Sequence, residues 1–169
     1  MHNELTKVDI QKMREEIAER ERRIPELLAE VKRTREFGDL SENDEYKTAK
    51  REKNANASRI RYLQNMIDTA IIIEVKSKED EVGLFDTVEV YNLDDEETEV
   101  YQIVTTLRTN VLAEDVPKVS KDAPFGRAVL GHKVGDRVTI RVNDTYSYRV
   151  EIRKITKGKD DPSIPINTF

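Results

Sequence analysis

The sequence predicts an α+β protein, with an N-terminal antiparallel coiled-coil hairpin of two long helices and a C-terminal antiparallel β-sheet domain containing one short helix. Apolar residues recur with heptad spacing in two long segments, and an acidic stretch containing a glycine separates these segments. In the second half of the chain the apolar period changes to two. We therefore expect a hairpin over residues 1–75, a sheet domain over residues 76–157 and a loose tail over residues 158–169.

The first arm of the hairpin is predicted to begin at Thr6, whose hydroxyl can accept a backbone amide while Asp9 complements the positive helix end. Pro25 costs about 3 kcal/mol inside a helix. Because the heptad phase continues across Pro25, we predict one kinked helix rather than two. The repeating positions are Ile10, Ile17, Ile24 and Val31, with Met13, Arg20, Leu27 and Thr34 as the second set.

The second arm repeats the pattern after the acidic stretch. Its two sets are Tyr46, Lys53, Ile60 and Ile67, and Ala49, Asn56, Leu63 and Ala70. Folding the chain about residue 40 pairs Val31 with Ala49 and Ile17 with Leu63. Gly38 permits the reversal, so we expect a hairpin within one chain and a monomer. Arms of about 30 residues, rising about 1.5 Å per residue, would project about 45 Å.

The second half of the chain has the alternation of half-exposed strands. The β-branched run over residues 70–75 is expected to open a sheet. Alternation then appears around Val88 and Val90, over residues 100–104, over residues 137–142 and over residues 146–153. Pro124 near the start and Gly131 past the end predict a short helix between them. These strands favour a small antiparallel sheet.

Composition excludes several classes of protein. The net charge of -5 argues against a general duplex-DNA binder. The chain contains no cysteine, which excludes disulfides and thiolate metal sites. Without a long apolar run we expect a cytoplasmic protein that does not enter a membrane. The sequence also lacks a phosphate-binding loop, a dinucleotide fingerprint and a nucleophile–base–acid set, so it does not predict an enzyme in its own right.

The acidic stretch over residues 38–46 is the strongest candidate site. Asp39 and Glu42 are three residues apart and can lie on one face of a helical turn. Two such carboxylates can share Mg²⁺ but cannot enclose it, so other ligands must come from elsewhere. The alternative is ordinary helix capping, either by Asp39 with Glu42 or by Ser41 with Asp44. Spacing alone favours capping, whereas the surplus of acids at the end of a long arm favours a functional site.

Bases follow the acidic stretch. Residues 46–61 hold six bases and one acid. Arg35, Lys47, Lys50 and Arg51 are candidates for binding phosphates beside the tip, since Arg and Lys suit phosphate contacts. The alternative for these four is a solvated coiled-coil face that forms ion pairs one helical turn apart.

Two motifs together resemble the bacterial GreA/GreB transcript-cleavage factors, over residues 5 to about 156. The first is the tip, and the second surrounds the predicted short helix. They read Gly38-Asp39-Leu40-Ser41-Glu42-Asn43 with Glu45-Tyr46, and Pro124-Phe125-Gly126-Arg127-Ala128 through Leu130-Gly131 to Gly135-Asp136.

The resemblance implies a coiled coil joined to an FKBP-like domain that docks on RNA polymerase. Family members pass the coiled coil through the secondary channel, where tip acids matched here by Asp39 and Glu42 help hold a second Mg²⁺. The polymerase then cuts the 3′ end of a backtracked nascent RNA. The family's basic patch corresponds to Arg35 and Lys50, with Arg51 adjacent. The docking segment corresponds to Phe125, Gly126, Arg127 and Leu130, although core packing is the alternative for Phe125 and Leu130.

Three other functions remain open at this stage. Some relatives occupy the same channel but inhibit cleavage, and Asp44 makes this tip more acidic than is usual in the family. An FKBP-like domain is also compatible with a prolyl isomerase or chaperone, although aromatics make up only 6% of the chain. A purely structural coiled-coil adaptor is the last alternative.

Overall fold

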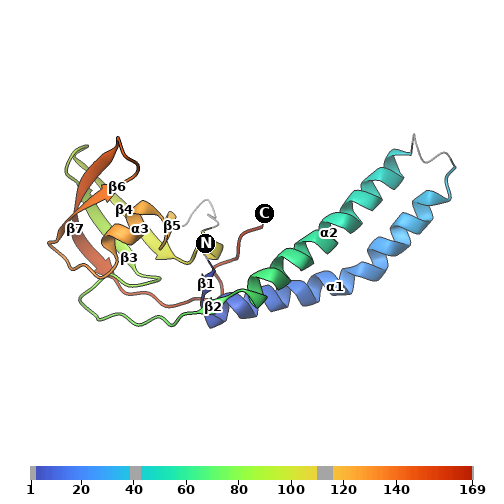
Figure 1. Cartoon of the computed structure of the whole chain (residues 1–169), viewed down its shortest axis with the longest axis horizontal. Helices are drawn as coiled ribbons and strands as arrows, with labels where there is room; N and C mark the ends of the chain where they lie inside the picture. Colours follow the sequence, from blue (N-terminus) through green and yellow to red (C-terminus); the bar gives the residue numbers. More distant parts are fainter. Residues whose placement is uncertain (1–2, 39–42, 110–115, 169) are drawn as a thin grey trace. The chain divides into compact units, whose positions relative to one another are not determined.

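The structure is a computed structural model that describes residues 3–38, 43–109 and 116–168 (Figure 1). It divides into two compact units, residues 10–70 and residues 1–9 together with 71–169. The predicted boundary near residue 75 therefore differs from the observed one. Residues 1–9 join the C-terminal unit because β1 (Glu4–Leu5) pairs in parallel with β2 (Ile71–Ile72).

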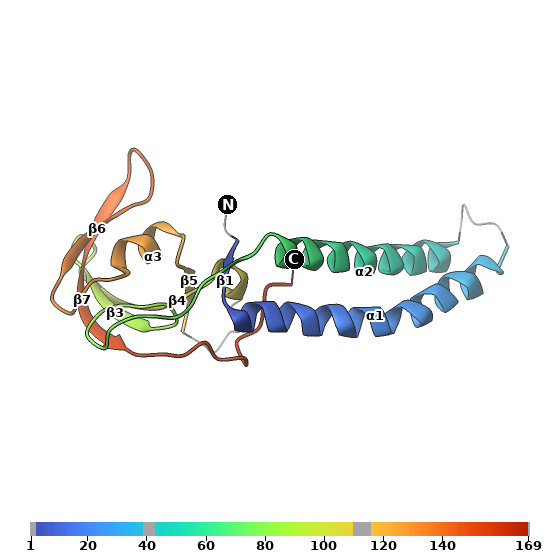
Figure 2. The ribbon, with the colours of Figure 1, turned by 60° about the horizontal axis from the view of Figure 1, so that its bottom comes forward.

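Two helices, α1 (Lys7–Arg35) and α2 (Asp44–Asp68), form the predicted hairpin and lie side by side in both ribbon views (Figures 1 and 2). The first turn of α1 is a capping box, in which the Asp9 amide donates to Thr6 Oγ1 at 3.2 Å and the Thr6 amide donates to Asp9 Oδ2 at 3.0 Å. Pro25 lies inside α1, which remains one helix as predicted. The buried apolar residues of the hairpin are Met13, Ile17, Val31, Ala49 and Leu63.

A polar layer interrupts the apolar seam. Glu16 Oε2 accepts hydrogen bonds from Arg20 Nε at 2.7 Å and from Arg59 Nε at 2.8 Å. Arg20 Nη1 donates to Asn56 Oδ1 at 3.2 Å, and Asn56 Nδ2 donates back to the Arg20 carbonyl at 3.0 Å. Such a layer fixes the register of the two arms, because sliding either arm would break these bonds. Ile24, predicted in the seam, is instead 37% exposed.

The C-terminal unit contains a five-stranded sheet of order β5-β4-β3-β7-β6. Its strands are β3 (Thr87–Asn92), β4 (Glu97–Val104), β5 (Lys118–Ser120), β6 (Arg137–Arg141) and β7 (Ser147–Thr156). All pairings are antiparallel except that β5 runs parallel to β4. The α+β class is thus confirmed, but the sheet is mixed rather than purely antiparallel. Residues 70–75 contribute β2 to the small parallel pair and do not join this sheet.

The core of this unit lies between one face of the sheet and α3 (Pro124–Val129), the predicted short helix. Because α3 packs against both β5 and β6, the sheet curls around it. The buried core residues are Val82, Val88, Val90, Ile103, Phe125, Val129, Val138, Ile140, Val150 and Ile152.

The segment after β7 is anchored, which differs from the loose tail expected over residues 158–169. Arg108, in the 3-10 helix η1 (Thr106–Arg108), is fully buried, and its Nη2 lies 2.5 Å from Asp160 Oδ1. Its Nη1 lies 3.2 Å from Asp9 Oδ1, and its Nε donates to the Ile164 carbonyl at 3.1 Å. Asn167 is buried and donates through Nδ2 to the Thr106 carbonyl at 3.0 Å. A buried guanidinium with fixed partners therefore holds the tail.

The polar layer should make the stability of the hairpin depend on pH. Burial alone would raise the pKa of Glu16, but hydrogen bonds from Arg59 and Arg20 outweigh it and lower that pKa below 4.5. The stability contributed by ionised Glu16 is therefore present above pH 4.5 and is lost as pH falls through the lower folded-state pKa. We expect Glu16→Gln to cost about 1–2 kcal/mol at neutral pH, because Arg59 loses a charged partner.

Urea unfolding at pH values above and below 4.5 measures this effect, and the wild type should lose more stability on acidification than Glu16→Gln. Glu19→Gln is the matched control, since Glu19 pairs with Arg22 on the exposed surface and should contribute little. Equal acid slopes for the wild type and Glu16→Gln would contradict the prediction.

Candidate functional site at the tip of the helical hairpin

The first arm ends in a short turn before the acidic stretch. After Arg35, the Glu36 amide donates to the Arg33 carbonyl at 3.3 Å and the Phe37 amide donates to the Thr34 carbonyl at 3.2 Å. Gly38 has a φ of 105°, a conformation that L residues rarely adopt. This glycine therefore allows the chain to turn away from the axis of α1, as the sequence predicted.

Asn43 joins the two arms at the tip. Its Oδ1 accepts the Tyr46 amide at 3.0 Å, which makes Asn43 the N-cap of α2. Its Nδ2 donates to the Thr34 carbonyl of α1 at 2.7 Å. One amide side chain thus caps α2 and donates a hydrogen bond to a carbonyl in the last turn of α1. This role of Asn43 was not predicted from the sequence, although Asn is among the most favoured N-cap residues and Asn43 stands three residues before Tyr46.

The observed N-cap of α2 tests whether the acidic stretch serves to cap this helix. Helix α2 begins at Asp44 with Asn43 as its N-cap, so the N-cap of α2 is neither Asp39 nor Ser41. Asp39 and Glu42 themselves lie outside the described residues. Their neighbours Asp44 and Glu45 occupy the first turn of α2, where acids complement the helix dipole.

The inner side of the tip is an open groove between the arms, with a volume of about 350 Å³. Arg33 Nη2 lies 2.6 Å from Glu30 Oε1 and 3.7 Å from Glu45 Oε2, and its guanidinium lies over the Phe37 ring. The hydrogen bond from Arg33 lowers the pKa of Glu30. This groove is lined by Glu30, Arg33, Asp44, Glu45, Thr48, Ala49 and Glu52.

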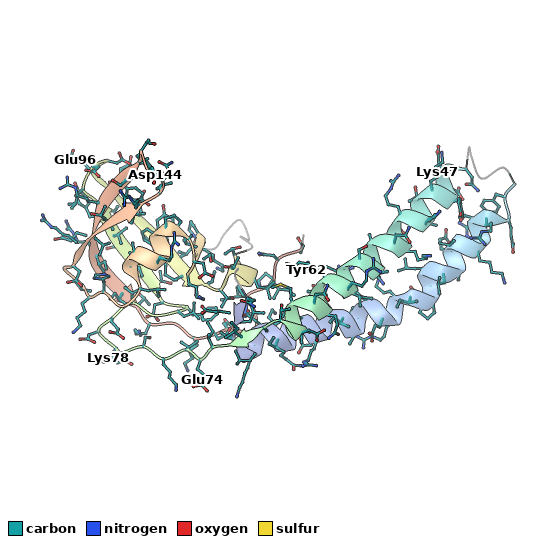
Figure 3. The ribbon with its side chains drawn as sticks, in the orientation of Figure 1. Lys47, Tyr62, Glu74, Lys78, Glu96 and Asp144 are labelled. Carbon is teal, nitrogen blue, oxygen red and sulfur yellow. The ribbon has the colours of Figure 1, made fainter. Side chains whose placement is uncertain are left out.

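Three of the four predicted phosphate-binding residues share one face of α2. Lys47, Lys50 and Arg51 line a groove of about 480 Å³, with Lys47 near the N-terminal end of the helix (Figure 3). Arg35 ends α1, and its guanidinium lies 5.9 Å from the centre of the Tyr46 ring. All four side chains are exposed, and none of them forms an ion pair with a described residue. These four residues are therefore solvated, as the alternative expected, but the ion pairs one helical turn apart that it also expected are not formed among the described residues.

The predicted docking residues divide into buried and exposed ones. Phe125 is 6% exposed and packs edge to face on Tyr101, with ring centres 4.9 Å apart. Gly126 is buried, and a Cβ there would meet the Ser120 carbonyl oxygen at 2.2 Å, so only glycine fits at this position. Leu130 packs against the core, and Arg127 alone among the four is exposed. Phe125 and Gly126 therefore position α3 and do not offer surface to a partner, which corrects the docking prediction for them.

The described residues contain no group of three or more His, Asp and Glu side chains that could hold a metal. No helix among the described residues is long and apolar enough to cross a bilayer.

Comparison with known proteins identifies the family. Residues 3–72 match the family "Transcription elongation factor, N-terminal", and residues 76–157 match "Transcription elongation factor, GreA/GreB, C-term". Transcription elongation factor GreA of Leuconostoc mesenteroides is 40% identical over 134 residues, which are 79% of this chain and 82% of that protein. The chain belongs to the GreA/GreB family of transcription elongation factors.

A second relative agrees with this identification. The GreA factor of Thermotoga neapolitana is 38% identical over 138 residues, 81% of this chain and 86% of that protein. A solved structure of GreA factor homolog 1 of Thermus thermophilus is 27% identical and covers 91% of this chain and 98% of that one, with a TM-score of 0.40. In this GreA/GreB-family chain the hairpin tip lies in the first matched segment and α3 lies in the second. The anchored tail follows the second segment.

The two functions of Asn43 can be separated by substitution. We expect Asn43→Ala to destabilise the hairpin by about 1–2 kcal/mol, because α2 loses its N-cap and the Thr34 carbonyl loses its donor. Asn43→Asp keeps an acceptor for the Tyr46 amide but removes the donor to Thr34. Amide hydrogen exchange at Tyr46 should therefore accelerate in Asn43→Ala and much less in Asn43→Asp. Unchanged protection of Tyr46 in the alanine variant would contradict this account of the tip.

Proposed function

We propose that this protein is a transcription elongation factor that stimulates RNA polymerase to cleave backtracked nascent RNA. The hairpin enters the secondary channel of the polymerase and presents Asp39 and Glu42 at its catalytic centre. In this proposal the protein is not an enzyme by itself, since the catalytic centre belongs to the polymerase. The observation that carries the proposal is the tip, where Asn43 caps α2 and links the arms, so that the acids before it are not needed as the cap. The similarity to GreA factors over most of the chain supports the same conclusion.

The chemistry of the tip suits a shared metal site. Asp39 and Glu42 provide carboxylates, the ligand type that Mg²⁺ prefers, and two of them leave most of its coordination to water, phosphate or a partner. Bound there, Mg²⁺ would stabilise the attacking and leaving oxygens of phosphodiester cleavage. The part of this chain is to carry the two carboxylates on a stiff arm whose register the Arg20–Asn56 bonds fix.

The basic face of α2 supplies the second part of the proposed activity. Lys47, Lys50 and Arg51 are exposed and have no described ion-pair partner, so little binding energy is lost in breaking internal bonds. Phosphates of the extruded RNA can therefore lie along this face while the RNA 3′ end lies at the tip. Arg35 extends the positive charge to the end of α1.

Neutralising the tip acids should abolish stimulated cleavage. We expect Asp39→Asn and Glu42→Gln each to lower the cleavage rate of backtracked complexes by at least about 100-fold, because a carboxylate that stabilises the developing charge is lost. The measurement is shortening of end-labelled RNA in assembled backtracked complexes with Mg²⁺. Glu36→Gln is the matched control, since Glu36 is an exposed acid on the α1 side of the tip and should cleave as the wild type does.

The same assay tests the inhibitory alternative. A factor that occupies the channel without stimulating cleavage would slow both elongation and intrinsic RNA shortening. If the intact protein gives that result, or if both tip-acid variants shorten RNA as the wild type does, the proposed function is wrong.

The basic face should act on binding more than on chemistry. We expect Lys50→Glu and Arg51→Glu to raise the protein concentration needed for half-maximal cleavage by about tenfold, with less effect on the maximal rate. Lys32→Glu is the control, because Lys32 is an exposed base in the last turn of α1. A lower maximal rate at an unchanged half-maximal concentration would contradict the role given to this face.

A further inference from the structure

The core face of the sheet carries a group of three tyrosines and one glutamate, far along the chain from the hairpin tip. Glu99 and Tyr101 lie on β4 and Tyr148 lies on β7, while Tyr146 stands just before β7 with its ring centre 5.9 Å from that of Tyr148. Antiparallel partners directly opposite each other share a face of the sheet. The partners of the three strand residues are all buried core residues: Val90, Val88 and Ile140.

This group is only partly covered by the rest of the unit. Tyr101 and Tyr148 pack against the core with part of each ring accessible, and Tyr146 is 52% exposed. Their hydroxyls form no hydrogen bond with a described residue. The group thus combines aromatic surface with polar atoms that are free to bind something else.

Glu99 is the unusual member of the group. Its Oε2 is buried and has no hydrogen-bond partner among the described residues. Burial raises the pKa of Glu99, and the acids Asp95 and Glu97 raise it further, while only the Asn92 side chain lowers it. No base is among the groups that act on it. A partly buried carboxyl without a cation is costly, and a cation from outside would remove that cost.

Arg149, the base next to Tyr148 in sequence, is engaged by another carboxylate. Arg149 follows Tyr148 on β7 and so points to the opposite face of the sheet. Its backbone amide and its Nη2 bond Asp94 at 2.9 and 3.1 Å. The turn between β3 and β4 adds further acids, with Glu96 at its end (Figure 3). The surroundings of the tyrosines are therefore negative and aromatic.

We propose that Glu99, Tyr101, Tyr146 and Tyr148 form a binding site, here called the tyrosine–glutamate site, for an arginine side chain presented by a partner protein. Arginine fits better than lysine because its planar guanidinium can stack on tyrosine rings and bond a carboxylate through two nitrogens at once. The Glu99 carboxylate supplies the acceptor when its side chain turns outward toward the rings, and the tyrosine hydroxyls can accept the remaining guanidinium hydrogens. This site does not depend on the hairpin tip or on the proposed RNA cleavage.

Titration of the full chain with N-acetyl-arginine amide, followed by NMR amide shifts, tests the site without any polymerase. We expect saturable shifts confined to residues 97–101 and 146–149. N-acetyl-citrulline amide is the matched probe, because it has nearly the same shape without the charge, and it should bind at least about tenfold more weakly. N-acetyl-lysine amide should also bind more weakly than the arginine probe.

Two variants distinguish the site from nonspecific attraction to acids. Glu99→Gln should weaken arginine binding about tenfold, and Tyr146→Ala, at an exposed ring, should weaken it without disturbing the core. Glu97→Gln is the control, because it removes a nearby charge that is not part of the site and should leave the affinity nearly unchanged. Absence of saturable shifts, equal binding of citrulline or lysine, or equal weakening in Glu99→Gln and Glu97→Gln would each overturn the proposal.

Discussion

The buried guanidinium of Arg108 is the interaction on which the C-terminal unit depends. It joins three segments that are distant in sequence, namely the first turn of α1 through Asp9, the helix η1 itself and the tail through Asp160. An arginine that is fully buried is tolerated only when its donors are matched, because an unpaired buried charge costs several kcal/mol. Here two carboxylates and two backbone carbonyls match it. Thr6, at the cap of α1, also bonds Asp160 through its hydroxyl, so the helix start and the tail share one network.

The hairpin uses polar groups in a different way. A continuous apolar seam would hold the arms together more strongly, but it would permit several registers at similar free energy. The bonds among Glu16, Arg20, Asn56 and Arg59 exist in one register only. At the tip, the bond from Asn43 to the Thr34 carbonyl adds the same restriction. The proposed function, in which the tip presents two carboxylates to the catalytic centre of the polymerase, requires arms with a fixed register, and these polar bonds provide it.

Features set by residues close together in the sequence could be predicted, whereas contacts between residues distant in the sequence could not. The hairpin was predictable because heptad spacing is local and the two arms mirror each other about residue 40. The strands β3, β4, β6 and β7 were predictable because alternation is also local. Arg108 and its partners were not, because Asp9 is 99 residues away and Asp160 is 52 residues away, and nothing local marks either pairing. The parallel pairing of β5 with β4 was not predicted either, because no local pattern marks it.

The residue that caps α2 was not predicted, for a different reason. Several residues of the acidic stretch are good caps, and the capping alternative named Asp39 or Ser41 because acids and hydroxyls there had the right spacing. Asn43 can serve both arms because its amide nitrogen donates to the Thr34 carbonyl while its oxygen accepts from the Tyr46 amide, whereas an ionised carboxylate in that position has no donor. The helix start at the tip therefore depends on Asn43, while the proposed chemistry is assigned to other residues, Asp39 and Glu42. Under the proposed function, Asp39 and Glu42 are selected for what they bind, and Asn43 maintains the helix start that follows them.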